Sequence, residues 1–280
     1  MTTTLRPTEP LQRAADGTRS RHYQVCVNSR PVGTLHLGTS SSLGESVAAV
    51  LDLTVQEQDR RRGRGTVAAL AAEEVARGWG CRVIEANIPA SAVSALRLAE
   101  ALAYRPRNRG MRKRLADTPP ALPAGSLARP MTPAEYTRWR TGREESYARE
   151  WMARGVPEEA ARAKSRHDHE TLLPKGLATQ DMEFSVVEHE GAAVGVLWLC
   201  LARPGEGGGK EAFVYYVESD PAHRGRGHGR TLMLVAERQA AAAGRDTLGL
   251  NVFAGNGPAE GLYTSLGYGT TLHGLQKPLL

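Results

Sequence analysis

The chain has 280 residues, which is enough for two domains that each bury a hydrophobic core. Its apolar content of 41% and charged content of 24% are those of an ordinary soluble globular protein. A membrane helix needs about 18 consecutive apolar residues, and no stretch of the sequence approaches that length. The first 20 residues are polar, so we expect no signal peptide there.

The three cysteines, Cys26, Cys81 and Cys200, are far apart in the sequence. Their isolation argues against a disulfide framework and a clustered metal site, and it predicts a protein of the reducing cytoplasm. The net charge of +6 is compatible with nucleic-acid binding or with an anionic cofactor. We favour the cofactor, because the densest arginine cluster, residues 60–64, lies inside a glycine motif.

The first half of the chain predicts alternating strands and helices after a flexible arm at residues 1–20, which are rich in Thr, Pro and Arg. Alternating apolar residues and turn residues set the strand limits, and an Ala-rich run before two glycines indicates a helix. The expected strands are 22–27, 32–37, 47–55, 82–87 and 111–115, and the expected helices are 66–77 and 92–103. This N-terminal domain covers residues 21–116, and a proline-rich linker at 117–126 follows it.

The second half, residues 127–280, predicts a longer domain. Thr132, Pro133 and Glu135 form the start signal of a helix that should reach about residue 154. The other expected helices are 158–172, 230–243 and 258–266, and the expected strands are 127–131, 182–188, 193–201, 212–217, 247–253 and 271–277. The chain is therefore of the mixed α+β class.

A glycine motif, Arg224-Gly225-Arg226-Gly227-His228-Gly229, stands between an expected strand and an expected helix. Such a loop points backbone N–H groups into one hollow at the positive end of a helix, which suits a pyrophosphate. The same pattern begins at Arg60, 164 positions earlier. The same offset relates Glu73 to Glu237, Tyr104 to Tyr268 and Lys113 to Lys277, so the chain contains one folding unit twice.

A dinucleotide-binding fingerprint is an alternative for the first copy, since Gly63, Gly65 and Ala68 have its spacing and Glu85 follows in the next strand. In that fingerprint the first glycine follows the strand almost immediately. Here residues 56–62 intervene, and three of them are arginines. We therefore disfavour this alternative.

The second copy resembles the GCN5-related N-acetyltransferase (GNAT) superfamily in the order strand, Arg-x-x-Gly-x-Gly, helix, strand, Asn, and a helix with an internal Tyr before Gly-Tyr. The residues that carry the resemblance are Asp220, Pro221, Arg224, Gly227, Gly229, residues 250–253, Asn256 and residues 262–268. Residues 22–116 match more weakly. The resemblance implies a tandem arrangement, as in mycothiol synthase, with two GNAT-type units. Each unit would have a mixed, mostly antiparallel central sheet flanked by helices, and the first would be shortened at its start.

The resemblance also implies site residues in the second copy. The expected acetyl-CoA ligands are Val217, Ser219, Arg224, Gly225, Arg226, Gly227, His228, Gly229, Arg230, Asn256 and Tyr263. In the family, a tyrosine at position 263 protonates the departing thiolate as general acid. Glu218 is our first choice for the general base, with Glu183 and His189 as alternatives. A backbone N–H near a β-bulge at 217–219 would polarise the thioester oxygen.

Each of these roles has a simpler alternative. Tyr263 could pack on the apolar face of its helix beside Leu262 and Leu266, Asn256 could act as a helix cap only, and Glu218 could be an exposed carboxylate at a strand end. In the first copy, Ala99 stands at the position of Tyr263 and Ala92 at that of Asn256. We therefore expect a catalytically silent first unit, in which Arg60, Gly63 and Gly65 bind acetyl-CoA structurally or not at all.

The sequence thus predicts an N-acetyltransferase that moves an acetyl group from acetyl-CoA to a primary amine by direct attack, without a metal. A small-molecule acceptor is favoured over a protein. The alternative is a non-enzymatic module that senses acyl-CoA with degenerate GNAT units. Nucleic-acid and membrane partners are disfavoured, and assembly as a homodimer stays open.

Overall fold

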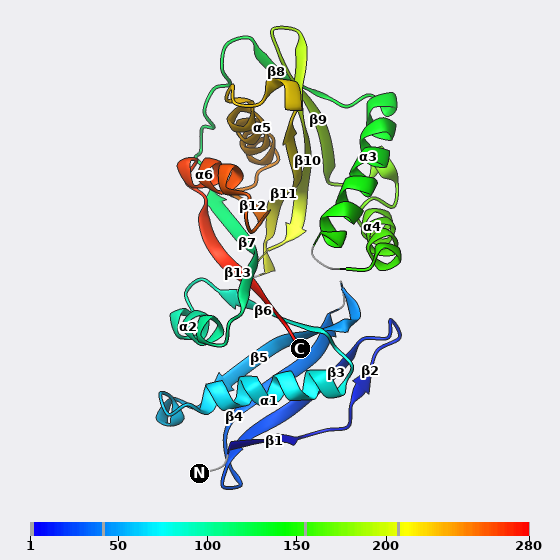
Figure 1. The fold of residues 1–280 in the computed structure, drawn as a ribbon. Coiled ribbons are helices and arrows are strands. Elements are labelled where there is room, and N and C mark those ends of the chain that lie inside the picture. Colours follow the sequence, from blue (N-terminus) through cyan, green and yellow to red (C-terminus); the bar gives the residue numbers. More distant parts are fainter. Residues whose placement is uncertain (1–2, 41–42, 154–155, 206–207, 280) are drawn as a thin grey trace. The chain divides into compact units, whose positions relative to one another are not determined.

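The computed structural model describes residues 3–40, 43–153, 156–205 and 208–279 (Figure 1). The chain forms two compact units, and each is described by itself. Unit 1 comprises residues 1–110 together with 270–280, and unit 2 comprises residues 111–269. The domain limits expected from the sequence, at residues 20, 116 and 126, remain predictions.

Unit 1 is a sheet with helices α1 (Arg64–Gly78) and α2 (Val93–Ala101). Neighbouring strands pair antiparallel except β5 and β6, which are parallel. The strand order is β1 (Thr3–Pro7), β3 (Arg19–Val27), β4 (Arg30–Ser40), β5 (Gly44–Val55), β6 (Val83–Pro89) and β13 (Gly269–Pro278), with β2 (Gln12–Arg13) paired to β3.

The expected flexible arm at the start of the chain is wrong in part. Residues 3–7 form β1, which pairs with β3 from Thr3 opposite Val27 to Pro7 opposite Tyr23. Backbone hydrogen bonds to an available sheet edge order this segment although its composition is that of a mobile arm.

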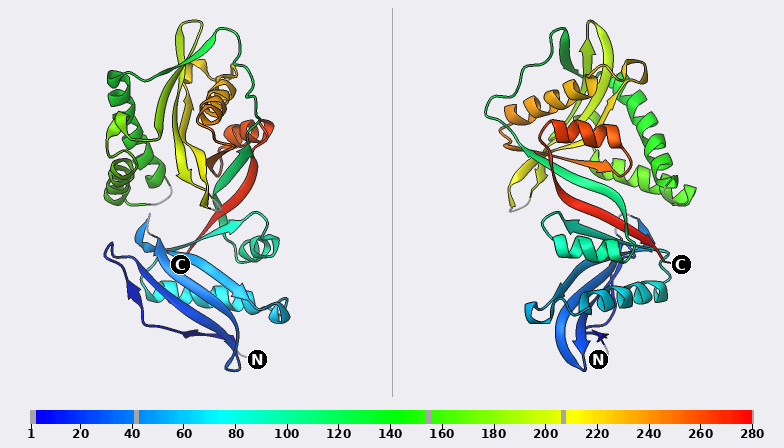
Figure 2. Two further views of the ribbon diagram at one scale, coloured as in Figure 1. Left: turned by 180° about the vertical axis from the view of Figure 1, so that it is seen from behind. Right: turned by 60° about the vertical axis from the view of Figure 1, so that its left-hand side comes forward.

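The core of unit 1 lies between the sheet and α1, which runs along one sheet face (Figure 2). The small residues Ala68, Ala72 and Ala76 repeat every four positions on α1, and all three are fully buried. They face Val25, Leu35 and Leu37 in the same cluster, which are also fully buried. A stripe of alanines lets the helix lie close to the sheet.

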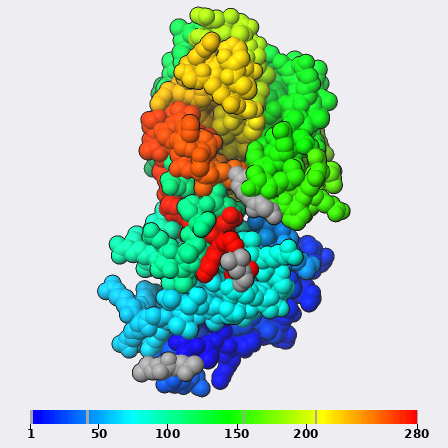
Figure 3. All heavy atoms as spheres, in the orientation of Figure 1, coloured from blue at the N-terminus to red at the C-terminus, as the bar shows by residue number. Residues whose placement is uncertain are grey.

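Unit 2 has a sheet with helices on both faces (Figures 1 and 2). Its strand order is β7 (Arg105–Arg114, of which residues 111–114 belong to this unit), β12 (Thr247–Phe253), β11 (Lys210–Ser219), β10 (Ala192–Pro204), β9 (Met182–His189) and β8 (Ser126–Pro130). Helices α3 (Pro133–Met152) and α4 (Glu158–Leu172) cover one face, and α5 (His228–Ala242) and α6 (Gly257–Ser265) the other. In the space-filling view, α6 lies at the left edge of unit 2, and α3 and α4 lie at its right edge (Figure 3).

Successive side chains of β10 point to opposite faces of the sheet, so this strand contributes to two separate cores. Leu197 and Leu199 belong to the core beneath α5, whereas Trp198 packs with Tyr136 and Phe184 beneath α3. The start signal of α3 is confirmed: the Thr132 hydroxyl accepts from the Glu135 amide, and the Glu135 carboxylate accepts from the Thr132 amide.

The two copies exchange their last strands. By the repeat, β7 follows α2 as β13 follows α6, yet β6 pairs with β13 in unit 1 and β12 neighbours β7 in unit 2. The two hydrophobic cores show the same exchange: Met111 and Leu115 are buried in the core of unit 2, and Leu275 and Leu279 are buried in the core of unit 1.

One ion pair in each unit depends on this exchange. In unit 2 the Lys113 ammonium lies 2.8 and 2.9 Å from the carboxylate oxygens of Glu237, which is 2% exposed and also accepts from the Tyr268 hydroxyl. In unit 1 Lys277 lies 2.9 and 2.7 Å from the equally buried Glu73. A buried carboxylate needs such partners, so each copy supplies the counter-ion for the other copy's glutamate.

Candidate active site

Strands β11 and β12 part in the middle of the unit 2 sheet. Their parallel register covers Ala212–Val214 opposite Leu248–Leu250, although β11 continues to Ser219 and β12 to Phe253. Beyond Val214, β11 keeps its other neighbour, since Gly195 of β10 still lies opposite Ser219. The side of β11 that faces β12 is therefore an open strand edge, where an extended ligand with amide groups can pair with the backbone.

A β-bulge in β11 decides which residues face which helices. Trp198 lies opposite Tyr216 and Leu199 opposite Val214, which leaves Tyr215 as the extra residue. The bulge expected at 217–219 therefore lies two residues earlier. The first copy has the same irregularity, because His36 lies opposite Asp52 and Leu37 opposite Val50.

Downstream of the bulge the side chains of β11 alternate between the two faces. Val217 packs against the core beneath α5, and the Ser219 hydroxyl lies near Gly229 at the start of that helix. Tyr216 and Glu218 point to the other face: the Tyr216 ring lies 6.2 Å from Trp139 of α3, and Glu218 lines a pocket that Trp139 also lines. Val217 and Ser219, two of the predicted cofactor contacts, therefore lie on one face of the sheet, and Glu218, the predicted base, lies on the other.

The glycine loop has the backbone that the sequence predicts. Gly225 and Gly227 have φ angles of 77° and 87°, in the left-handed region that favours glycine. Gly227 is the N-cap of α5, and no side chain caps the first amides of this helix. A Cβ on Gly229 would lie 3.1 Å from a Leu262 methyl carbon, so a side chain there would crowd α6. The loop is a bare cradle of N–H groups at a helix N-terminus, which fits a diphosphate.

The arginines of the motif surround this cradle. Arg224 and Arg226 are exposed, and Arg230 donates to the Ser265 hydroxyl at 2.6 Å. His228 is buried, and its pKa is lowered by burial and then by the charges of neighbouring histidines. The imidazole is therefore neutral at pH 7 and adds no positive charge, which leaves the arginines and the helix amides to attract an anion.

Tyr263 of α6 is 7% exposed, and its ring packs in the unit 2 core at 6.1 Å from the ring of Tyr268. The packing alternative is therefore correct for the ring. Burial raises the pKa of its hydroxyl to about 12. That hydroxyl has no hydrogen-bond partner among the described residues, so no described protein group competes for its proton.

Asn256 is confirmed as the N-cap of α6, because its side-chain oxygen accepts from the Ala259 amide at 3.3 Å. In the first copy Ala92 stands at the corresponding N-cap of α2 and makes no side-chain cap bond. Ala99 is buried on α2, where it provides neither a phenol nor any other proton donor.

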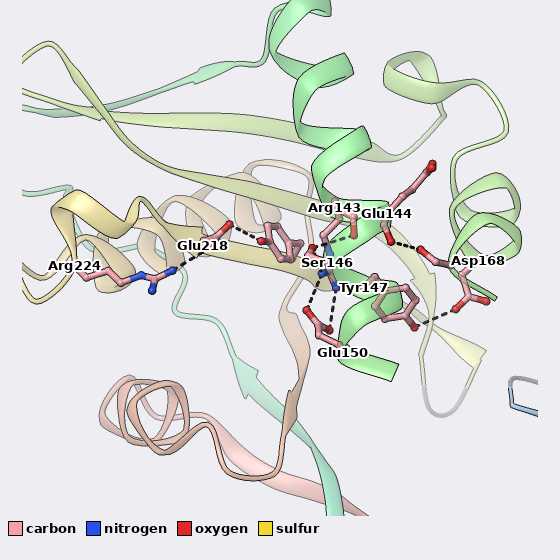
Figure 4. A network of polar contacts seen from close by, with 10 residues as sticks. Arg143, Glu144, Ser146, Tyr147, Glu150, Asp168, Glu218 and Arg224 are labelled. Carbon is pink, nitrogen blue, oxygen red and sulfur yellow. Dashed lines mark hydrogen bonds and ion pairs between the residues drawn. The ribbon is translucent and has the colours of Figure 1, made fainter. Parts of the chain in front are cut away.

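Glu218 lies at the centre of a line of polar contacts (Figure 4). Its carboxylate accepts from the Tyr216 hydroxyl at 2.5 Å and from the Arg224 guanidinium at 3.2 Å. Burial, followed by the contact with Glu218, raises the pKa of Tyr216, so this phenol stays protonated and keeps donating. The contacts hold the carboxylate on the α3 side of β11, with 43% of its side chain exposed to an incoming molecule.

The other two candidate bases lie elsewhere. His189 hydrogen-bonds Ser126 at 2.9 Å, and its ring lies 5.2 Å from that of His228, beside the start of α5. Glu183 is on β9, and burial raises the pKa of its carboxyl. Glu218 is therefore the candidate that the structure places next to the parted strands.

A buried arginine of α3 was missed in the sequence. The Arg143 guanidinium pairs with Glu150 at 2.8 Å and lies 4.5 Å from the Tyr216 ring and 5.0 Å from the Tyr147 ring (Figure 4). Cation–π contacts of this kind hold aromatic rings in place. The spacing of 143, 147 and 150 puts all three on one helix face, a pattern that could have revealed the cluster.

The first copy keeps the cradle backbone. Gly63 is the N-cap of α1 with a φ of 72°, and Arg61 adopts a φ of 58° at the position of Gly225. The side chains differ, because Arg64 is buried and pairs with Asp59, which also binds Arg30 at 2.7 Å. The first loop therefore has the shape of the second but different internal charges.

Comparison with known proteins identifies the family. The Acetyltransferase (GNAT) family profile matches residues 2–104 and 140–268, one segment in each copy. The chain belongs to the GNAT family of acetyltransferases. This GNAT chain is 30% identical over 266 residues to the mycothiol acetyltransferase of Amycolatopsis mediterranei, covering 88% of the chain and 80% of that relative. It is also 30% identical over 151 residues to the uncharacterized N-acetyltransferase YdgE of Bacillus subtilis, covering 53% of the chain and 95% of that protein.

Solved structures agree on a tandem GNAT fold. A GCN5-related N-acetyltransferase from Sphaerobacter thermophilus superposes with a TM-score of 0.59 at 20% identity, over 92% of this chain and 80% of that one. A tandem GNAT protein from the clavulanic acid biosynthesis pathway gives 0.53 at 20% identity, over 96% and 85%. At this identity the superpositions establish the fold alone.

Within the described ranges, no helix combines the length and the apolar character that crossing a membrane requires. In the same residues, no group of three or more His, Cys, Asp or Glu side chains is arranged to hold a metal ion.

Proposed function

We propose that unit 2 transfers the acetyl group of acetyl-CoA to the primary amine of a small molecule. The observation that carries the proposal is the glycine loop with its two left-handed glycines, which opens α5 directly after the parted strand β11. GNAT enzymes generally use acetyl-CoA, and this combination offers a diphosphate site next to an open strand edge that suits the amide-containing pantetheine arm.

The residues of unit 2 would hold acetyl-CoA in three places. The amides from Gly225 to Gly229, with Arg224, Arg226 and Arg230, would bind the diphosphate. The open backbone of Val217 and Ser219 would pair with the pantetheine arm, and the Val217 amide would donate to the thioester oxygen as charge develops there. Asn256 would keep α6 in position through its cap bond.

The proposed reaction is a direct transfer in a ternary complex. The amine nitrogen forms a bond to the thioester carbon, the carbon–sulfur bond breaks, and its electron pair leaves with sulfur. Glu218 takes the proton that the amine loses, directly or through a water, and Tyr263 gives its hydroxyl proton to the sulfur. No covalent enzyme intermediate is needed, and Cys200, the cysteine of this unit's sheet, is buried.

The first copy would not catalyse the reaction. Ala99 cannot donate a proton, and the first loop carries the Arg64–Asp59 pair in place of two histidines. Its retained backbone, with Arg60, Gly63 and Gly65, is compatible with structural binding of acetyl-CoA. A calorimetric titration gives the number of working cradles as a stoichiometry of one or two.

Replacing Gly227 by alanine is expected to weaken acetyl-CoA binding about tenfold or more. A Cβ disfavours the left-handed backbone by about 1–2 kcal/mol, and the loop amides would turn away from the diphosphate. Gly244 is the matched control, because it ends the same helix, has a φ of 72° and, like Gly227, has no atom within 4 Å of an added Cβ. Gly244→Ala should lose similar stability and keep its acetyl-CoA affinity in the same titration.

Thiol release in the presence of amines then tests transfer. Acetylation that Gly227→Ala impairs supports the proposal. Tight binding of acetyl-CoA without transfer to any amine would favour the acyl-CoA sensing module. Failure of the wild-type protein to bind acetyl-CoA would contradict both.

A further inference from the structure

A pocket on the α3 side of the β11 strand has a chemistry that selects among acceptors. Its volume is about 250 Å³, slightly below the usual range of ligand pockets, about 300–1,000 Å³, so only a small molecule would fit. The residues that carry the argument are Glu135, Arg138 and Trp139 of α3, Val196 of β10, and Glu218 and Asp220 at the end of β11. Because Glu218 lines the pocket, a bound molecule would lie next to the proposed base.

Arg138 is an uncompensated cation on the α3 wall of this pocket. The neighbouring arginines are neutralised: Arg140 pairs with Glu144 at 2.9 Å and Arg143 with Glu150 at 2.8 Å. Arg138 is exposed and has no ion-pair partner among the described residues. A planar guanidinium that has no ion-pair partner can bind a carboxylate or phosphate through two parallel hydrogen bonds.

The acidic group next to Arg138, the Glu135 carboxylate, forms its ion pair with Arg129, which also pairs with Glu188 at 2.7 Å, and not with Arg138. The Glu135 carboxylate accepts from the Arg129 guanidinium at 2.8 and 2.9 Å and from the Thr132 amide at 2.8 Å. These contacts, the one with Arg129 first, lower the pKa of Glu135 to about 2. The positive charge of Arg138 therefore remains free to meet a ligand.

The β11 wall of the pocket has the opposite character. Glu218 is held there by Tyr216 and Arg224, and Asp220 accepts from the Ala222 amide at 2.8 Å while 47% of its side chain stays exposed. Asp220 also lies 3.4 Å from the His223 ring, but both carboxylates keep more than 40% of their side chains exposed, so an ammonium group can still contact them on this wall. Trp139 and Val196 add apolar surface to the pocket lining.

We infer that this pocket is the acceptor site and that it takes a small zwitterionic amine, with the amino group toward Glu218 and Asp220 and an anionic group, a carboxylate or a phosphate, against Arg138. The inference rests on the proposed function and adds the substrate class. Electrostatic complementarity of this kind gives specificity by rejecting molecules with the wrong charge. Arg138 is then a specificity-determining residue.

The test compares acceptors that differ only in the anionic group. With 4-aminobutyrate and butylamine, the wild-type protein should show at least about a tenfold higher kcat/KM for the amino acid, since one charged hydrogen-bonded pair is worth about 1.5–3 kcal/mol. Arg138→Ala should abolish this preference by raising KM for 4-aminobutyrate about tenfold more than KM for butylamine. Arg138→Lys should restore part of it, and Arg138→Glu should shift the preference to 1,4-diaminobutane.

Arg166→Ala is the matched control, because Arg166 is an exposed arginine on α4 and should leave both acceptors unaffected. Calorimetry of 4-aminobutyrate with the CoA-saturated protein gives a readout independent of turnover, and Arg138→Ala should abolish that binding. Equal acetylation of both amines, or equal losses for both in Arg138→Ala, would overturn the inference while leaving the proposed function intact. Absence of 4-aminobutyrate binding to the CoA-loaded protein would also overturn it, whereas absence of acetyl-CoA binding would instead contradict the proposed function.

Discussion

Tyr263→Phe is expected to lower kcat about a hundredfold or more and to change acetyl-CoA affinity less than twofold. General acid catalysis contributes about 10²- to 10⁴-fold, and the substitution removes the hydroxyl that would protonate the departing sulfur. The ring stays in place, because it is buried in the unit 2 core against Tyr268, so the fold should be retained. Stopped-flow thiol release and calorimetry measure the two quantities separately.

The pKa of Tyr263 makes the pH profile informative. Burial raises the pKa of its hydroxyl to about 12, so the phenol keeps its proton at all pH values below that. Activity should therefore show no alkaline loss from this group between about pH 8 and pH 10, where an unperturbed tyrosine would begin to ionise.

Tyr268→Phe is the matched control for the phenol. The Tyr268 hydroxyl donates to Glu237 at 3.2 Å, so its loss should reduce stability and leave kcat of the folded protein near the wild-type value. If Tyr263→Phe turned over at the wild-type rate, the general-acid role would be wrong. Ala99 would then no longer account for a silent first copy.

Lys113→Met is expected to lower the free energy of unfolding of unit 2 by about 3–5 kcal/mol, because it leaves the buried Glu237 carboxylate without its counter-ion. Lys277→Met should lower the stability of unit 1 by a similar amount through Glu73. The result runs against the chain order: a residue of the first copy stabilises the unit that holds the proposed active site, and a residue near the C-terminus stabilises the other.

Native-state hydrogen exchange of the full chain resolves the two effects by position. Lys113→Met should reduce protection of β11, β12 and α5 and spare β4 and α1, and Lys277→Met should do the reverse. Lys175→Met, at an exposed lysine of unit 2, controls for the loss of a surface charge and should change neither unit. Loss of protection in unit 1 on replacing Lys113 would contradict the strand exchange.

Much of the site could be predicted from local sequence. Glycines at 225 and 227 indicate a left-handed backbone because other residues adopt it at a cost, and the structure has that backbone at both positions. The cap roles of Thr132 and Asn256 also depend on a few neighbouring residues, and both are confirmed. The equivalence of Ala99 with Tyr263 follows from the constant repeat offset.

Other features of the site depend on contacts between distant segments. The bulge at Tyr215 depends on how β11 matches β10, and the family resemblance placed it two positions too late. The position of Arg143 against the Tyr216 ring needs α3 to lie over the end of β11. The lack of an ion-pair partner for Arg138 also becomes known only from the folded structure, in which Arg140 pairs with Glu144 and Arg143 with Glu150.

The sequence by itself determined the family, the duplication, most helix and strand limits and the anion cradle, because each of these rests on local backbone preferences or on residues close in the chain. Only the tertiary structure decided where the last strand of each copy lies. Lys113 and Lys277 occupy the same repeat position and could each pair with Glu73 or Glu237, so the local sequence does not distinguish the two arrangements. The folded chain places Lys113 with Glu237 and Lys277 with Glu73, since strand pairing is settled by long-range hydrogen bonds and burial rather than by local propensity.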